Sequence, residues 1–376
     1  MVVEALATGE RTVLVERGWE GRYLRTGHLV YMLGGTLFAQ PMDLASLATR
    51  GTATPVIEGI ETAIASASFS ISASGTLAYL TGANLADART LVWVTRNGEE
   101  LGLGLEPLLY NNPRVSPDGS AIAVEVQAGG RTNVRVYDLR RRTLRHITFG
   151  AERDYNPLWA PDGNSIVFGS TRQGGGLFRK SADGTGEVER LQDGLTLSRP
   201  YSWSPNGDRL IYSLGGDLFA LSLQGEEPPQ ALLETPDREA HPEVSPDGRW
   251  LAYTSDESGE LNVYVRPFPD LESGLWPVST GGGLEPVWSS NGRELFYRSG
   301  VAIKVVTVGT GDGFRMGTPR TLFTGPYLDL GAGRQYDAAP DGKRFLMLKA
   351  APADDRSRRV VVVQNWFEEL KRLVPN

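Results

Sequence analysis

The chain has 376 residues, a formal net charge of -7 at pH 7 and no cysteine. It therefore offers no disulfide framework, thiolate metal site or cysteine nucleophile, and its acidic balance argues against a general binder of nucleic acid or anionic membranes, whose surface would be basic. No apolar run approaches the roughly 18 residues that span a bilayer, so we expect no membrane insertion.

A turn motif returns along the whole chain. In its clearest copy, Ser116–Gly119 reads Ser-Pro-Asp-Gly and precedes the apolar run Ala121–Val124. Proline presets φ at the first corner, aspartate bonds back to the backbone, and glycine takes the left-handed conformation that other residues resist. Each copy is therefore predicted to join two strands as a hairpin. Counted by their glycines, the copies fall at Gly27, Gly75, Gly119, Gly163, Gly207, Gly248, Gly292 and Gly342.

The spacing of these turns predicts the fold class. Consecutive copies are 41 to 50 residues apart, and each unit offers up to four short strands. A period of roughly 40–45 residues with four strands per unit is typical of a β-propeller. We therefore predict an all-β fold, a single propeller of four-stranded antiparallel blades over residues 1–364. Eight turns match eight blades; seven is the alternative, because the first two turns are degenerate.

The last unit has second and third strands but lacks an outer one. Its third strand is Val360–Val363, and the corresponding strand of the second unit is Leu91–Val94. Arg11–Glu16 matches the outer strand Arg320–Gly325 in residue type. We therefore predict that an N-terminal strand at about 11–16 completes this C-terminal blade, which would remove an open sheet edge.

After the last strand, the apolar period changes to that of a helix over residues 365–376. Asn365 is a candidate N-cap, with Glu368 three residues further on. The residues that share one helix face are Trp366, Leu370, Leu373 and Val374. We expect a short helix docked on the propeller; a helix that binds a partner is the alternative.

The innermost strands of a propeller begin near one mouth of the central channel, so one repeat position recurs around that mouth. Aligned by the turns, this position and its neighbours are rich in Asn, His, Glu, Gln and Arg, which are poor strand formers. Such a ring suits a polar ligand, and a channel that is simply wet and polar is the alternative. The predicted ligand-binding residues are Asn112, Tyr155, Asn156, Arg199, His241, Glu285, Arg334 and Gln335.

No motif in the chain predicts catalysis. It lacks the kinase signatures His-Arg-Asp and Asp-Phe-Gly, it lacks a Gly-x-Ser-x-Gly elbow, and its three histidines have no metal-binding spacing. We assign no catalytic residue, metal or cofactor. If the ring carries chemistry, His241 is the candidate base and Glu285 the acid or metal ligand. Asn112 and Asn156 would then orient the substrate.

Two further sets of residues are interpreted as structural. His28 lies at a turn exit and His146 on an outer strand. Trp159, Trp203 and Trp288 recur just before the turn, which favours packing between blades over stacking on a ligand.

The Ser-Pro-Asp-Gly turn followed by Leu-Ala-Tyr or Ile-Ala-Val resembles the WD40-like (PD40) repeat of TolB-type β-propellers, which is also found in tricorn-like and dipeptidyl-peptidase-like propellers. The opening at Val13–Glu16 and His28–Tyr31, and the tail Asn365–Leu370, resemble propeller regions linked to bacterial serine/threonine kinases. The resemblance implies a scaffold for protein or ligand binding, although this fold hosts unrelated activities.

We therefore expect a monomeric, non-catalytic binding module that recognises a protein, peptide or small polar ligand at the channel mouth. A propeller hydrolase or lyase acting at the same ring is one alternative, and the sensor segment of a kinase-linked receptor is another. The compartment is open: the N-terminus has no signal-peptide pattern, which predicts a cytoplasmic chain as written. A segment of a kinase-linked protein would instead be extracytoplasmic.

Overall fold

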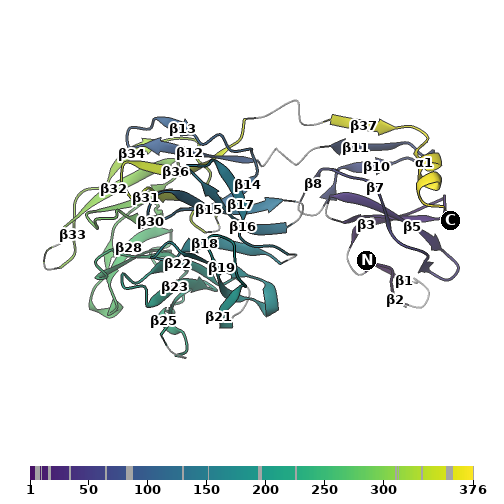
Figure 1. The fold of residues 1–376 in the computed structure, drawn as a ribbon. Helices are drawn as coiled ribbons and strands as arrows, with labels where there is room; N and C mark the ends of the chain where they lie inside the picture. Colours follow the sequence, from purple (N-terminus) through teal and green to yellow (C-terminus); the bar gives the residue numbers. More distant parts are fainter. Residues whose placement is uncertain are drawn as a thin grey trace. The chain divides into compact units, whose positions relative to one another are not determined.

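The computed structural model describes most of the chain. The described residues are 1–4, 9, 11–15, 18–33, 35–63, 66–81, 88–128, 131–150, 152–193, 197–224, 227–309, 311, 313–331, 333–352 and 359–375. They divide into two compact units, one made of Met1–Ala88 with Ala351–Asn376 and the other of Arg89–Ala350 (Figure 1). No helix in the described part of the chain is long and apolar enough to cross a membrane.

The second unit, Arg89–Ala350, contains six antiparallel sheets within its described residues. Three of them are β35-β36-β12-β13 (Tyr336–Ala338, Arg344–Ala350, Arg89–Thr95, Glu100–Gly102), β14-β15-β16-β17 (Leu109–Val115, Ala121–Ala128, Arg131–Asp138, Thr143–His146) and β18-β19-β20-β21 (Asp154–Trp159, Ser165–Ser170, Gly176–Ser181, Glu189–Asp193). The others are β22-β23-β24-β25 (Arg199–Trp203, Arg209–Leu214, Asp217–Ser222, Gln230–Leu233), β26-β27-β28-β29 (Glu239–Val244, Trp250–Ser255, Asn262–Pro267, Trp276–Pro277) and β30-β31-β32 (Leu284–Trp288, Glu294–Ser299, Ala302–Gly309), whose β32 pairs with both β33 (Arg315–Met316) and β34 (Arg320–Thr324). Two 3₁₀ turns, η2 (Arg172–Gly174) and η3 (Leu271–Ser273), lie in loops.

These six sheets follow one another around a common centre. The inner strands β14, β18, β22, β26 and β30 each contact the next, and β35 contacts β14. Apolar side chains fill the space between neighbouring sheets; one such cluster joins Val167 and Leu177 to Leu210 and Tyr212. The predicted all-β fold of four-stranded antiparallel blades is therefore confirmed. The predicted count of eight blades in one ring is not.

The first unit, Met1–Ala88 with Ala351–Asn376, contains smaller sheets. Its strands are β1 (Val2–Glu4), β2 (Arg11–Val13), β3 (Trp19–Leu24), β4 (His28–Leu33), β5 (Thr36–Asp43), β6 (Ala48–Thr49), β7 (Thr54–Ile57), β8 (Thr62–Ala63), β9 (Ser66–Ala67), β10 (Phe69–Ile71), β11 (Leu77–Thr81) and β37 (Arg359–Val363). The two main sheets run β3-β4-β5, with β6 and β7 pairing with β5, and β10-β11-β37. This division of the chain was not expected from the sequence, which predicts one propeller over residues 1–364.

The repeated turn adopts the predicted geometry. In its clearest copy, Gly119 has φ 71° and donates its N–H to the carbonyl of Ser116 at 2.8 Å. Asp118 Oδ1 accepts from Ser116 Oγ at 2.6 Å and from the Ser120 N–H at 3.0 Å. The same glycine hydrogen bond recurs at Gly163, Gly207, Gly248, Gly292 and Gly342. The prediction of a hairpin at each of these turns is confirmed.

The strand that closes the second unit differs from the prediction. β12 pairs with β36 along its whole length, from Arg89 opposite Ala350 to Thr95 opposite Arg344. This corrects the predicted closing strand at 11–16, because Arg11–Val13 pairs instead with β1. Val360–Val363, predicted as the third strand of the last blade, pairs with β11.

The burial of their side chains explains why β12, and not Val360–Val363, pairs within the last blade of the second unit. All four residues of the β12 run Leu91–Val94 are buried, so both faces of this strand pack against apolar neighbours. In β37, by contrast, Val360 and Val362 are 69% and 57% exposed. A strand that is apolar on both faces is suited to a sheet covered on both sides, as in a ring of blades. Both runs are short and apolar, so the repeat pattern did not separate them.

The C-terminal helix, α1 (Trp366–Leu373), packs on the first unit. Trp366, Phe367 and Leu370 are buried against strands of that unit, whereas Leu373, predicted on the same face, is 39% exposed. Asn365 occupies the predicted N-cap position, but it has φ 56° and makes no side-chain capping bond. The backbone makes the connection instead, since the Trp366 N–H donates to the carbonyl of Gly75.

His28 helps to fasten this helix. Its side chain is fully buried, with Nε2 2.6 Å from the carbonyl oxygen of Val374 and Nδ1 3.0 Å from Thr26 Oγ1. The structural interpretation of His28 is therefore confirmed.

Candidate functional site

Five inner strands of the second unit share a bulge at the predicted ring position. The register with the next strand shifts between Asn111 and Arg114, and at the corresponding place in β18, β22, β26 and β30. Four ring residues there have left-handed backbones, namely Asn112 (φ 48°), Asn156 (54°), His241 (53°) and Glu285 (54°). Residues other than glycine rarely adopt such φ values, which cost about 1–3 kcal/mol each. A strained bulge repeated at one place is the kind of feature that re-aims side chains near a site.

Asn112, Asn156 and Gln335 come together around a carboxylate that the sequence analysis missed. Glu125, on β15, accepts a hydrogen bond from Asn112 Nδ2 at 2.8 Å and from the Asn156 N–H at 3.2 Å. Gln335 Nε2 donates to Asn112 Oδ1 at 3.2 Å, and Asn156 Nδ2 donates to the carbonyl of Pro200 at 2.7 Å. We call Asn112, Glu125, Asn156 and Gln335 the amide cluster.

Glu125 is a buried acid held mainly by amides. Burial raises its pKa, and the hydrogen bonds from Asn112 and the Asn156 backbone offset part of that rise. A lone glutamate inside the apolar run Ala121–Val126 was the available signal, because a charged side chain is almost never buried without partners.

The chain just before β35 crosses close to the amide cluster. Gly333 has φ +77°, and a Cβ at this position would lie 2.1 Å from Asn112 Oδ1 and 2.3 Å from Asn156 Oδ1. A side chain at this position would force both amides to shift, so both the backbone conformation and the space favour glycine.

Arg334 and Glu285, two further ring residues, are engaged in buried ion pairs. Arg334 lies 2.6 Å from Glu243 and 3.1 Å from Asp337, and its carbonyl accepts a hydrogen bond from Arg114. Glu285 lies 3.4 Å from Arg298. These partners orient both ring side chains within the channel wall.

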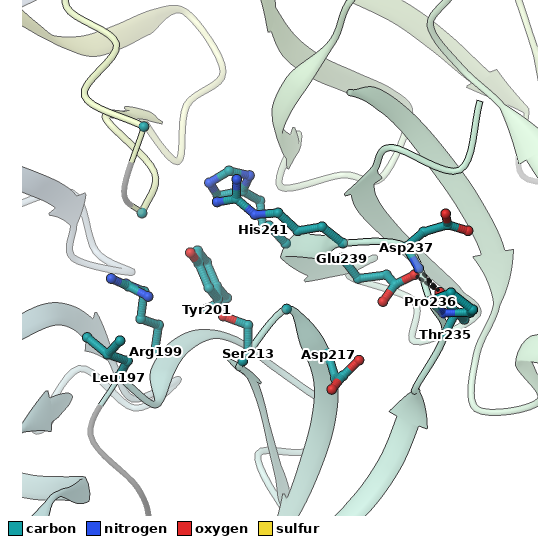
Figure 2. A pocket seen from close by; sticks show the side chains of 16 residues that line it. Leu197, Arg199, Tyr201, Ser213, Asp217, Thr235, Pro236, Asp237, Glu239 and His241 are labelled. Atoms are coloured by element: carbon teal, nitrogen blue, oxygen red, sulfur yellow. Dashed lines mark hydrogen bonds between the residues drawn. The ribbon is translucent and has the colours of Figure 1, made fainter. Parts of the chain in front are cut away.

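A pocket of about 550 Å³ opens where the inner strands β22 and β26 begin. Its walls combine the ends of β22, β24 and β26 with the loop between β25 and β26 and with Gly331 and Gly333. Figure 2 shows Arg199 and Tyr201 on one side and Asp217 and Glu239 on the other. Of the eight predicted residues, Arg199 and His241 line this pocket. The charged residues that sequence analysis missed are Asp217, Asp237, Arg238 and Glu239.

His241 is a neutral, buried member of the pocket wall. Burial lowers its pKa to about 3, and the cations Arg114, Arg238 and Arg334 add to this effect. Its ring makes an edge contact with Tyr201, with the centroids 5.5 Å apart. A base with so low a pKa is poorly matched to proton abstraction near neutral pH.

Tyr155 contacts two residues that line the pocket, Leu197 and Arg199. It is buried, its hydroxyl accepts the Leu197 N–H at 2.9 Å, and its ring lies 6.0 Å from the guanidinium carbon of Arg199. Among the described residues, no carboxylate forms an ion pair with Arg199 or Arg238. The pocket therefore presents charged groups that have not been matched within the fold.

The recurrent tryptophans connect neighbouring blades. Trp159 Nε1 donates to the carbonyl of Arg114 at 3.0 Å, Trp203 Nε1 to that of Trp159 at 2.8 Å, and Trp288 Nε1 to that of Glu243 at 3.0 Å. Each bond runs to the preceding blade, so the predicted packing role is confirmed. Within the described ranges, no three His, Asp or Glu side chains are grouped as a metal ion would require.

Comparison with known proteins identifies the repeat. The family model described as the TolB beta propeller domain (PD40) matches residues 51–216. The chain is 26% identical over 209 residues to the uncharacterized peptidase YuxL of Bacillus subtilis, a match that covers 41% of this chain and 31% of that protein. The chain thus matches about a third of the length of this relative.

A solved structure supports the propeller fold. A structure described as a TolB of Agrobacterium tumefaciens superposes with a TM-score of 0.57 at 18% identity, covering 71% of this chain and 99% of that one. TolB of Acinetobacter baumannii gives a TM-score of 0.46 at 17% identity, covering 80% and 79%. Residues 51–216 thus match the TolB beta propeller domain, as the Ser-Pro-Asp-Gly repeats predict, and the Agrobacterium structure supports the propeller fold.

Proposed function

We propose that this protein is a non-catalytic binding module that recognises a peptide, a protein segment or a small polar ligand at the mouth of the channel in its second unit. The observation that carries the proposal is the pocket of about 550 Å³ lined by Arg199, Arg238 and Asp217, charged groups without ion-pair partners among the described residues. A volume of this size suits a small ligand or a few residues of a peptide.

The environment of His241 favours binding over catalysis. Its pKa of about 3 keeps the imidazole neutral at physiological pH, where it can exchange hydrogen bonds with a ligand but is a weak base. Glu285, the other residue considered for chemistry, is 1% exposed and paired with Arg298.

A selection experiment tests the proposal directly. A random-peptide phage library would be selected on the immobilised full chain, and a panel of polar metabolites would be screened by thermal shift. The pocket variant Arg199→Ala/Arg238→Ala should lose the ligands that the wild type enriches. The charge-matched control is Arg140→Ala/Arg141→Ala, two exposed arginines on the β16–β17 turn. Failure to enrich any ligand, or ligands that bind the pocket variant equally well, would contradict the proposal.

A further inference from the structure

The pocket has an acidic side whose charge is not balanced. Glu239 is 3% exposed; its Oε1 accepts from Thr235 Oγ1 at 2.6 Å, while its Oε2 has no hydrogen-bond partner. A buried carboxylate oxygen without a donor costs the desolvation free energy of that atom, which native structures normally recover with a hydrogen bond from the protein or from a bound molecule such as water. Figure 2 shows Glu239 beside the pocket, with Asp217 facing the same space.

The charges nearest to Glu239 add to this imbalance. Burial raises the pKa of Glu239, the hydrogen bond from Thr235 offsets part of the rise, and the carboxylates of Asp217, Asp237 and Glu257 raise it further. Among the described residues, neither Asp217 nor Asp237 forms an ion pair. Several carboxylates gathered around an open volume attract a cation from the ligand.

Among the described residues, the arginines of the same pocket form no ion pair with its carboxylates. Arg199 lies against the ring of Tyr155, and Arg238 acts on His241, whose pKa it helps to lower. In Figure 2, Arg199 is on the side opposite Asp217 and Glu239. The arginines therefore leave the acidic side for a cation that comes from outside the chain.

The wall next to Arg199 is apolar. Leu197 lines the pocket, is 50% exposed and has φ +90°, a conformation that is strained for a bulky residue. Together with the ring of Tyr201, it offers a contact surface for methylene groups. A short apolar chain that ends in a positive charge would satisfy both sides of the pocket.

We infer that the ligand of this pocket carries an alkylammonium group, seated with its charge against Glu239 and Asp217 and its methylenes against Leu197. This inference rests on the proposed binding function and names its ligand chemistry. A lysine side chain and a peptide amino terminus are the two sources of such a group, and the neighbouring Arg199 would donate hydrogen bonds to the peptide carbonyl or carboxylate oxygens.

Calorimetric titration of the full chain with three tripeptides separates these sources. The probes are acetyl-Gly-Lys-Gly-amide, its neutral isostere acetyl-Gly-norleucine-Gly-amide, and Gly-Gly-Gly-amide with a free amino terminus. We expect at least one of the two charged probes to bind tenfold or more tightly than the norleucine peptide. The stronger of the lysine and triglycine peptides identifies the source.

Isosteric variants test the role of the carboxylates. Glu239→Gln, which can keep the bond to Thr235, should weaken the charged probe tenfold or more, and Asp217→Asn should act in the same direction from a half-exposed position. Glu189→Gln, on the exposed outer strand β21, is the matched control and should change nothing.

Three results would overturn the inference. These are equal binding of the norleucine peptide, no binding of either charged probe at millimolar concentration, and unchanged binding by Glu239→Gln and Asp217→Asn. If neutral or acidic peptides from the library selection still bind through Arg199 and Arg238, the proposed function stands while the alkylammonium inference falls. If that selection also yields nothing, both fall together.

Discussion

The channel interior and the pocket at its mouth are both rich in charge, but ion pairs form in the interior and not between the described charged residues of the pocket. Inside, Arg334 is matched by Glu243 and Asp337, and Glu285 by Arg298. At the mouth, Arg199 and Asp217 have no ion-pair partner among the described residues, although both line the same pocket. Matched charges hold a structure together, whereas unmatched charges beside an open volume are available to a ligand.

The difference also changes how the predicted ring should be interpreted. Asn112, Asn156 and Gln335 look like ligand-binding residues in sequence, because polar side chains are unusual in inner strands. In the structure they bond mainly to one another and to Glu125. We therefore expect their substitution to affect folding more than ligand binding.

The largest expected effect is on the free energy of unfolding, and it distinguishes the channel interior from the pocket. Arg334→Ala leaves Glu243 and Asp337 buried without their cation and should lower the free energy of unfolding by about 3–5 kcal/mol. Arg199→Ala removes an unmatched, half-buried arginine and should change it by about 0.5 kcal/mol or less. Urea unfolding of both variants, followed by tryptophan fluorescence, measures the difference.

Arg179→Ala provides the control for loss of an ion pair. Its partner Glu189 is exposed, so breaking this pair should cost about 1 kcal/mol or less. Equal losses for Arg334→Ala and Arg199→Ala would remove the distinction between a structural interior and a binding mouth.

The predictable parts of the fold are those whose stabilising contacts lie between residues close together in the sequence. The turn at Ser116–Gly119 carries its whole explanation in four residues, so the hairpins and the all-β fold followed from the sequence. The pairing of β12 with β36 joins residues about 250 positions apart and depends on burial of both strand faces. Leu91–Val94 and Val360–Val363 offer the same local pattern, so spacing assigned each to the wrong neighbour.

The site was predictable to a similar extent. Ring residues such as His241 and Glu285 were found because poor strand formers marked the bulges on which they lie. Asp217 and Arg238 were missed because they follow a turn and end a loop, where charged residues are ordinary. Only the folded arrangement brings these side chains to one pocket.

The second expected effect concerns pH. The pKa of His241 is about 3 in the fold, against about 6.5 in an unfolded chain, so the folded state binds fewer protons between these values. Stability should therefore fall as the pH drops below about 6.5 and continue to fall towards 3. Between pH 7 and pH 5 the loss from this one group should be about 2 kcal/mol.

A variant separates the contribution of His241 to the pH dependence from that of the buried glutamates. Glu125, Glu243 and Glu285 have pKa values raised by burial, so their protonation acts in the opposite direction. His241→Asn places at this position the residue that two other blades have there, with the same left-handed backbone. Urea unfolding at pH 7 and pH 5 should show a smaller loss for the variant than for the wild type; equal losses would exclude His241 as the titrating group.

The smallest expected effect tests how tightly the chain at Gly333 packs against the amide cluster. Gly333→Ala and Gly281→Ala replace glycines of similar φ, +77° and +73°, so both carry a similar backbone penalty of about 1 kcal/mol. Only at Gly333 would the new methyl group meet Asn112 and Asn156, and we expect about 1–2 kcal/mol of additional destabilisation in urea unfolding. If the two variants are equally stable, the chain before β35 has room to move, and the amide cluster would then be open to a ligand in the same way as the pocket.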